Sequence, residues 1–294
     1  MLGPIRAVTT TADDLKRVED AYTRYFDYRV VERGEVATDT AAGWGAPAVA
    51  GRPLLVLMPA SGEPTVLRFV QQPLPAGYRP LTTFGWNSTE IVVQNTDTLE
   101  EKLKGSPFHI LFPPRPLDGL PDIRAMQGTG PAGEMLYLTW IQRPIPGHDL
   151  PVAKSFVDRC FIAVLGGPDM EAMRRFYHDC FGNMPGPIAT PRIQALSAAN
   201  GLSSETKHPL CTVPLGGQSL IEIDEYPKVA TIRPKPQGGL PAGMAIVTFE
   251  FPRLDGLSLK PIAPPSPSRL PPYKDHRTAT VIGAAGELIE LVEV

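Results

Sequence analysis

The chain has 294 residues, of which 43% are hydrophobic and 20% charged, a globular composition with room for two domains. Its 28 basic and 31 acidic side chains leave a formal net charge of −3, which argues against nucleic acid or an anionic membrane surface as a partner. Charges, prolines or glycines interrupt every apolar stretch before the ~20 residues that a membrane-spanning helix needs.

The first 143 residues carry one pattern twice, a strand and a helix followed by three strands. The segment "IRAVTTT" predicts the first strand, and apolar Leu15, Val18, Tyr22 and Phe26 at helical spacing predict a helix capped by Asp14. The next strands are "YRVVERGEV", "RPLLVLMP" and "TVLRFVQQP". The pattern restarts with a strand in "FGWNSTEIVVQ", a helix in "DTLEEKLKG" and three strands that end in "GEMLYLTWI". These are two βαβββ units.

The second half repeats the first after a proline-rich linker. The phrase at 13–27 returns at 168–182, an offset of 155 positions, and "GEMLYL" at Gly133 returns as "GELIEL" at Gly286. The fourth unit lacks most of its helix, because "PRLDGLS" is short and contains proline. We therefore expect an α+β protein of two tandem domains, each of two βαβββ units that form a cup-like half-barrel. The predicted boundaries are 1–143, a linker at 144–154, and 155–294.

The cysteines and the N-terminus indicate a reducing compartment. Cys160, Cys180 and Cys211 are odd in number and form no Cys-x-x-Cys, so neither a disulfide framework nor a zinc knuckle is expected. The N-terminus lacks the basic and apolar segments of a secretory signal. We expect a cytoplasmic protein.

The repeated phrase, with the form Asp-(Leu/Met)-x-x-(apolar)-x-x-x-Tyr, and the closing Gly-x-x-x-(Tyr/Glu)-Leu resemble the vicinal oxygen chelate superfamily. This group includes glyoxalase I, extradiol dioxygenases, bleomycin-resistance proteins and fosfomycin-resistance enzymes. The resemblance implies that two units curl into a cup and that inward side chains of four strands meet at its centre. It also implies a bacterial protein that forms homodimers.

Metal-dependent members place His, Gln or Glu at those four inward positions. The matching positions in the first half are Ala7, Arg68, Glu90 (or Ser88) and Tyr137. Those in the second half are Ile162, Glu222, Ile246 (with Met244 on the same face) and Glu290. The departure from the ligand pattern predicts no metal cofactor, although Glu222 and Glu290 with water would hold Mg²⁺ or Ca²⁺ weakly.

Five side chains are candidates for acid/base chemistry. Glu222 and Glu290 are expected to face one another in the second cup, where paired carboxylates raise one pKa. In the first cup Glu90 would act as a base, with Tyr137 and Arg68 binding a substrate oxygen. The alternative in the first cup is an internal Arg68–Glu90 ion pair that only neutralises two buried charges.

Other side chains are candidates for substrate contacts. Aromatic rings where loops meet the cups would stack on a flat ligand. Two histidines lie near the second cup and would complete a non-standard site with Glu290. The predicted substrate-binding residues are Trp44, Trp86, Ile162, Met244, Ile246, His208 and His276.

We therefore expect a protein that acts on a small, partly apolar metabolite that bears oxygen or an aromatic ring. As an enzyme it would be a metal-independent lyase or isomerase. Two alternatives remain open: a non-catalytic protein that binds a drug or toxin, as bleomycin-resistance proteins do, and a metal-dependent relative of extradiol dioxygenases. The second cup is the favoured site, because it contains Glu290.

Overall fold

Two mixed β-sheets and five α-helices make up the computed structural model, which describes all residues from Met1 to Val294. The eight-stranded sheet, called sheet A, has the strand order β13 (Ser266–Pro267), β14 (Arg277–Ile282), β15 (Leu288–Glu293), β12 (Met244–Phe251), β1 (Ile5–Ala12), β4 (Val66–Gln71), β3 (Pro53–Met58) and β2 (Arg29–Glu35). The seven-stranded sheet B has the order β10 (Leu210–Leu215), β11 (Ser219–Glu225), β9 (Val157–Gly167), β5 (Gly85–Val93), β8 (Met135–Ile141), β7 (Leu120–Thr129) and β6 (His109–Leu117). The α+β class and the tandem repeat of βαβββ units are confirmed.

Each sheet combines one unit from each half of the chain. β1 pairs antiparallel with β12, so the first and fourth units form sheet A. β5 pairs antiparallel with β9, so the second and third units form sheet B. Residues 144–154 join β8 to β9 within sheet B and do not separate the two cups. The expectation that the units of one half share a cup is therefore wrong.

The physical reason is that the edge strands of the four repeated units can pair in more than one combination. The periodicity of a strand shows which face is buried but not which backbone edge it pairs with. With four similar units in one chain, the hydrophobic pattern is satisfied by either arrangement.

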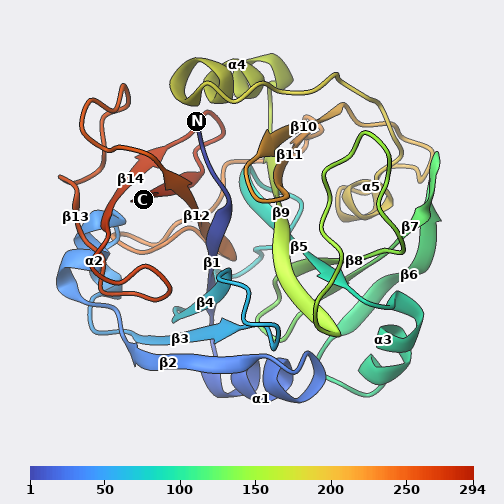
Figure 1. Ribbon diagram of the computed structural model, residues 1–294, viewed down its shortest axis with the longest axis horizontal. Helices are drawn as coiled ribbons and strands as arrows, with labels where there is room; N and C mark the ends of the chain where they lie inside the picture. The colour runs from blue at the N-terminus through green and yellow to red at the C-terminus, as the bar shows by residue number, and fades with distance from the viewer.

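The helices lie around the two sheets (Figure 1). α1 (Leu15–Tyr25) and α4 (Met170–Phe181) lie at the lower and upper edges of the view, and α3 (Thr96–Leu103) lies against sheet B. The caps are those predicted, because Asp14 accepts a hydrogen bond from the Arg17 backbone N–H and Asp169 accepts one from that of Ala172. The fourth unit contains no helix, as expected.

Two short helices were not predicted. α2 (Thr38–Gly43), followed by a 3-10 turn at Pro47–Val49, lies beside sheet A, and α5 (Gln194–Ala199) lies beside sheet B. Each has only six residues, too few for a periodic apolar pattern to stand out. They occupy matching places in the first and third units.

The repeated phrase has a clear structural role. The Tyr22 hydroxyl in α1 donates to Glu134 at 2.7 Å, and the Tyr177 hydroxyl in α4 donates to Glu287 at 2.9 Å. Both carboxyl groups are buried, in the turns that lead into β8 and β15. Each helix is thus tied to the unit that follows it in the chain. Glu287 is only 2% exposed.

Candidate functional site

The strand register defines four matching inward positions in each sheet. In sheet A, Thr9 pairs with Arg68 across β1 and β4, and Thr248 pairs with Glu290 across β12 and β15. We call this set cup A. In sheet B the matching pairs are Val164 with Glu222 and Glu90 with Tyr137, and we call these four residues cup B.

The five predicted acid/base residues therefore divide differently from the expectation. Arg68 and Glu290 meet in cup A, and Glu90, Tyr137 and Glu222 belong to cup B. Glu222 and Glu290 do not face one another. The alternative Arg68–Glu90 pair is also wrong, since Arg68 pairs with Glu290. Both corrections follow from the exchange of units between the sheets.

Cup A contains a closed hydrogen-bonded network around one ion pair. Arg68 Nη2 lies 2.7 Å from Glu290 Oε2 and 2.7 Å from Thr248 Oγ1. Arg68 Nη1 donates to the Tyr273 hydroxyl at 2.6 Å, and Nε donates to Thr9 Oγ1 at 2.8 Å. Arg68 is fully buried, so the network satisfies a charge that water cannot reach.

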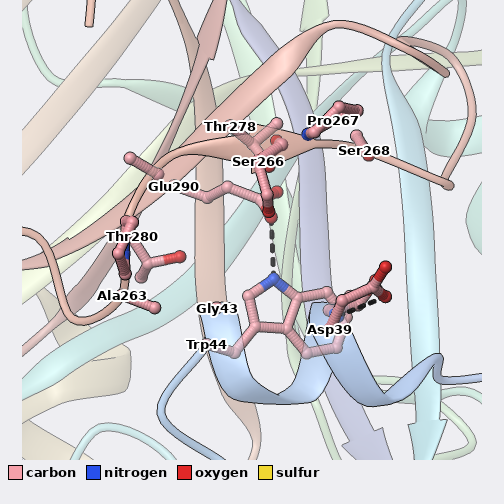
Figure 2. A pocket seen from close by; sticks show the side chains of 13 residues that line it. Asp39, Gly43, Trp44, Ala263, Ser266, Pro267, Ser268, Thr278, Thr280 and Glu290 are labelled. Atoms are coloured by element: carbon pink, nitrogen blue, oxygen red, sulfur yellow. Dashed lines mark hydrogen bonds between the residues drawn. The ribbon is translucent and has the colours of Figure 1, made fainter. Parts of the chain in front are cut away.

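The carboxylate of Glu290 is equally saturated. Oε2 accepts from Arg68, Thr248 and Tyr273, and Oε1 accepts from Trp44 Nε1 at 2.7 Å. Figure 2 shows the Trp44 contact among the side chains that line a hollow. The hollow has a volume of about 20 Å³, the space of roughly one water. Burial acts to raise the pKa of Glu290, but the charge of Arg68 and the hydrogen bonds bring it below its usual value. Glu290 is therefore a weak base, because its pKa is lowered and four donors occupy its oxygens.

These residues do not fit a metal ion. Glu290 is the only carboxylate among the four inward positions of cup A, and the guanidinium of Arg68 lies at ion-pair distance from it. A divalent cation would have to displace this charge and the donors on both carboxylate oxygens.

Cup B has the opposite character, with several acids and no cation. Burial raises the pKa of Glu90 to about 7, although Thr139 donates to its Oε1 at 2.6 Å. Burial and the charge of Glu90 raise the pKa of Asp224 to about 8. The pKa of Glu222 is raised well above its usual value by burial, then by Asp224 and Glu90. None of the three carboxyl groups forms an ion pair within the protein.

Several buried polar atoms in this part of sheet B lack any hydrogen-bond partner. They are the Ser88 and Tyr137 hydroxyls, the Tyr226 hydroxyl and both oxygens of Asp224. Each of these side chains is at most 6% exposed. An unpartnered buried polar group costs about 1–3 kcal/mol, so such a concentration in one cup is typical of a site built for a ligand.

Cup B does not fit a transition-metal ion either. It contains no histidine, and nowhere in the structure do three or more His, Cys, Asp or Glu side chains lie close enough together to hold a metal ion. The weak Mg²⁺ or Ca²⁺ site suggested for Glu222 with Glu290 is excluded by their places in different cups.

The predicted substrate-contact residues are dispersed. Ile162 belongs to the buried cluster of cup B, whereas Ile246 packs with Trp44 beneath cup A. Trp86 and Met244 instead line a hollow of about 240 Å³ between the sheets, where Trp86 Nε1 donates to the Leu288 carbonyl at 2.8 Å.

Neither candidate histidine contacts Glu290. His208 is buried and its Nε2 lies 2.9 Å from Ser197 Oγ in α5. His276 is on the surface, with Nδ1 2.8 Å from the Glu293 carbonyl. The expectation that one of them completes a site with Glu290 is wrong.

Sequence reasoning did not select several polar residues in and beside the cups. Thr9, Thr248 and Tyr273 complete the network of cup A, and Thr139 and Asp224 lie beside the acids of cup B. The place of Asp224 could have been predicted, because it lies two residues after Glu222 and therefore on the same strand face. The place of Tyr273 could not, since it lies in a loop outside the repeated pattern.

Solved structures with this architecture were found, although no family model and no curated protein sequence matches the chain. Glyoxalase I from Zea mays superposes with a TM-score of 0.62 at 16% identity, over 99% of this chain and 92% of that chain. A proposed dioxygenase from Bacillus subtilis superposes with a TM-score of 0.62 at 12% identity, over 99% of this chain and 85% of that chain.

These matches extend over both sheets, so the chain shares the two-sheet fold of these solved structures. At this level of identity the likeness defines the fold and leaves the chemistry to the residues of the two cups. No helix of the structure has the length and apolar character needed to span a bilayer.

Proposed function

We propose that the protein binds a small, partly apolar, oxygen-bearing molecule in cup B and transfers a proton on it without a bound metal, as a lyase or isomerase. The observation that supports this most is the group of unpartnered buried polar atoms on Tyr137 and Asp224, beside a Glu90 carboxyl of pKa about 7. Cup A is assigned a structural role, because the carboxylate of Glu290 and the guanidinium of Arg68 neutralise one another.

The roles follow from protonation state and position. Glu90 has both forms available near neutral pH, so its carboxylate can take a proton from a carbon next to a carbonyl. The Tyr137 hydroxyl has no partner within the protein and would donate to the oxygen on which negative charge develops. Glu222 is half-buried and holds its proton, so it can return one to the product.

The apolar part of the molecule would pack against residues that share the buried cluster of Tyr137. Ile162 comes from β9, and Ile193 and Leu196 come from the segment around α5. The same lining supports the alternative of a binding protein without chemistry. The two functions differ in whether Glu90 exchanges a proton with the bound molecule.

The test is hydrogen exchange into a bound ligand. Small carbonyl compounds that raise the melting temperature are incubated with the protein in D₂O, and loss of the C–H signal next to the carbonyl is followed by proton NMR. We expect Glu90→Gln to slow this exchange by about 10²–10⁴-fold and Tyr137→Phe to slow it less.

Glu134→Gln is the matched control. Glu134 is also a buried carboxyl whose pKa burial raises to about 7, but it is bonded to Tyr22 outside the cups. Exchange at an unchanged rate in Glu90→Gln would contradict the proton-transfer role. Binding that is lost in Tyr137→Phe, with no exchange in the unaltered protein, would favour the binding protein.

A further inference from the structure

The sequence repeat relates each inward position of cup A to one position of cup B. At one of these related positions the side chains have opposite charge. Val164 follows Thr9 by the repeat offset of 155, and Glu222 pairs with Val164 as Arg68 pairs with Thr9. Glu222 is therefore the counterpart of Arg68. In the same way Glu90 is the counterpart of Thr248, because their partners Tyr137 and Glu290 are 153 positions apart.

Cup A shows how this fold neutralises a buried carboxylate. The guanidinium of Arg68 reaches across the sheet to Glu290, with the Trp44 and Tyr273 rings 5.3 Å and 5.8 Å from its central carbon. The cation is thus held by a carboxylate, hydroxyl groups and aromatic faces.

Cup B has the same kinds of group, but no cation pairs with its acids. Glu90, Glu222 and Asp224 supply carboxyl groups, and Tyr137 and Tyr226 supply aromatic rings with unpartnered hydroxyls. The buried Arg233 acts on the Tyr226 and Tyr78 rings and forms no ion pair with these acids. Both Asp224 oxygens lack any donor although this side chain is 1% exposed. Leaving these two oxygens without a donor costs free energy. Glu222, the counterpart of Arg68, adds another acid to the same cup.

We propose that cup B binds an organic cation, the ammonium or guanidinium group of a small amine-bearing molecule, where cup A has the side chain of Arg68. This inference rests on the proposed function, since it names the class of molecule that the same cup takes. The apolar residues Ile162, Ile193 and Leu196 would contact the rest of the molecule.

An organic cation fits better than a metal ion. The carboxyl groups of cup B do not converge closely enough to ligate one small ion. An alkylammonium or guanidinium group has several N–H donors spread over a larger volume, and its donors can reach separate carboxylates. Tyrosine rings also attract such cations through their faces.

Binding of a cation should release protons. The free cup holds protons because burial raises the pKa of Glu90 to about 7 and that of Asp224 to about 8. A cation favours the ionised acids, so its affinity should rise with pH by about tenfold per unit for each proton released. A neutral ligand of the same shape would show no such rise.

The experiment compares matched probes by calorimetry on the full-length protein. Benzylamine and butylguanidine carry the cation, benzyl alcohol and benzoate are neutral and anionic matches, and CaCl₂ tests an inorganic ion. We expect the two cations to bind at least tenfold more tightly than benzyl alcohol. Their measured binding enthalpy should differ between two amine-free buffers with different enthalpies of ionisation, because the buffer takes up the released protons. We expect no binding of benzoate or Ca²⁺ to the cup.

Isosteric variants assign the binding to the cup. Asp224→Asn and Glu222→Gln should each weaken benzylamine binding at least tenfold, and Glu287→Gln, a buried carboxyl outside the cups, should leave it unchanged. Glu222→Arg should abolish it by supplying the internal cation of cup A.

Equal binding of benzyl alcohol, binding of Ca²⁺ in place of the amines, or no binding of either cation at millimolar concentration would overturn the inference. The proton-transfer proposal is judged separately by exchange into carbonyl ligands. If a neutral carbonyl ligand exchanges a proton through Glu90 and no amine binds, the proposed proton transfer is retained and the cation inference is rejected.

Discussion

Single side chains decide what each cup can do. The four inward positions of cup A include one acid and one base, and those of cup B include two acids and no base. As a result Glu290 stays ionised and fully bonded, whereas near neutral pH Asp224 is mostly protonated and Glu90 is present in both forms. The same backbone thus supports a closed ion pair on one side and a set of unsatisfied acids on the other.

The ion pair of cup A is expected to be strongly coupled. Arg68→Met leaves a buried carboxylate without its counter-charge, and Glu290→Gln leaves a buried guanidinium, so each should lower the free energy of unfolding by about 3–5 kcal/mol. The double variant should cost much less than the sum of the two. Urea denaturation of the four proteins measures this coupling.

An exposed pair provides the comparison. Lys104 lies beside Glu101 with both side chains largely exposed, so Lys104→Ala should change stability by less than about 0.5 kcal/mol. Additive effects of the Arg68 and Glu290 variants would show that the pair is not the centre of the network.

Helices and turns carry the contacts that join successive units. Glu287 accepts hydrogen bonds from Tyr177 and from the Ala285 backbone N–H at 2.8 Å. Its carboxyl group lies directly over Gly283, where an added Cβ would be 2.0 Å from Oε1. Gly130 has the same relation to Glu134. A glycine is therefore needed at each turn because a carboxylate occupies the space of its side chain.

Gly283→Ala should consequently be destabilising. The new methyl group would push Glu287 away from Tyr177, and loss of one such buried hydrogen bond costs about 1–3 kcal/mol. Thermal unfolding measures the effect. Gly43→Ala is the control, because a Cβ at Gly43, the last residue of α2, meets nothing within 4 Å and alanine favours helix. Equal melting temperatures for the two variants would contradict the role of the turn.

Each of the two sheets is built from strands of both halves of the chain. β1 takes its antiparallel neighbour from residues 244–251, and β5 takes its neighbour from residues 157–167. Each half alone would expose two strand edges and the buried faces beside them. The large shared cluster of 44 buried residues also draws on both halves.

The predicted domains 1–143 and 155–294 can be tested as separate fragments. We expect each fragment to be unfolded or to self-associate when produced alone, and a mixture of the two to recover the circular dichroism and cooperative unfolding of the full chain. Two stable monomeric fragments would instead support the domain boundaries predicted from the sequence.

The buried acids predict how stability depends on pH. Burial raises the pKa of Glu134 and of Glu287 to about 7 from 4.5. The folded state therefore holds more protons than the unfolded chain between these values, so the free energy of unfolding falls as pH rises from 4.5 to 7. At about 1.4 kcal/mol per pKa unit, each group accounts for about 3 kcal/mol of this decline.

The double variant Glu134→Gln/Glu287→Gln should reduce that decline by about 3 kcal/mol for each group, as measured by urea unfolding from pH 4.5 to 8. Glu90 and Asp224, whose pKa values burial raises to about 7 and about 8, should maintain the rest of the decline. Glu290, whose pKa is lowered, acts in the opposite sense and loses its contribution as the solution becomes more acid. An unchanged slope in the double variant would show that these two groups are not the cause.

The order of strands and helices, the caps of α1 and α4, and the inward positions of Arg68, Glu90, Glu222 and Glu290 could be read from the sequence. Periodicity and capping are local properties, and the repeat offset transfers a register from one half to the other. The grouping of these residues could not be read from it, because Arg68 meets Glu290 only when β1 pairs with β12, and Glu90 approaches Glu222 only when β5 pairs with β9. Strand edges carry the same backbone donors and acceptors whatever their side chains. The choice of partner, and with it the division between a closed cup and an acidic one, is therefore set by packing between distant parts of the chain.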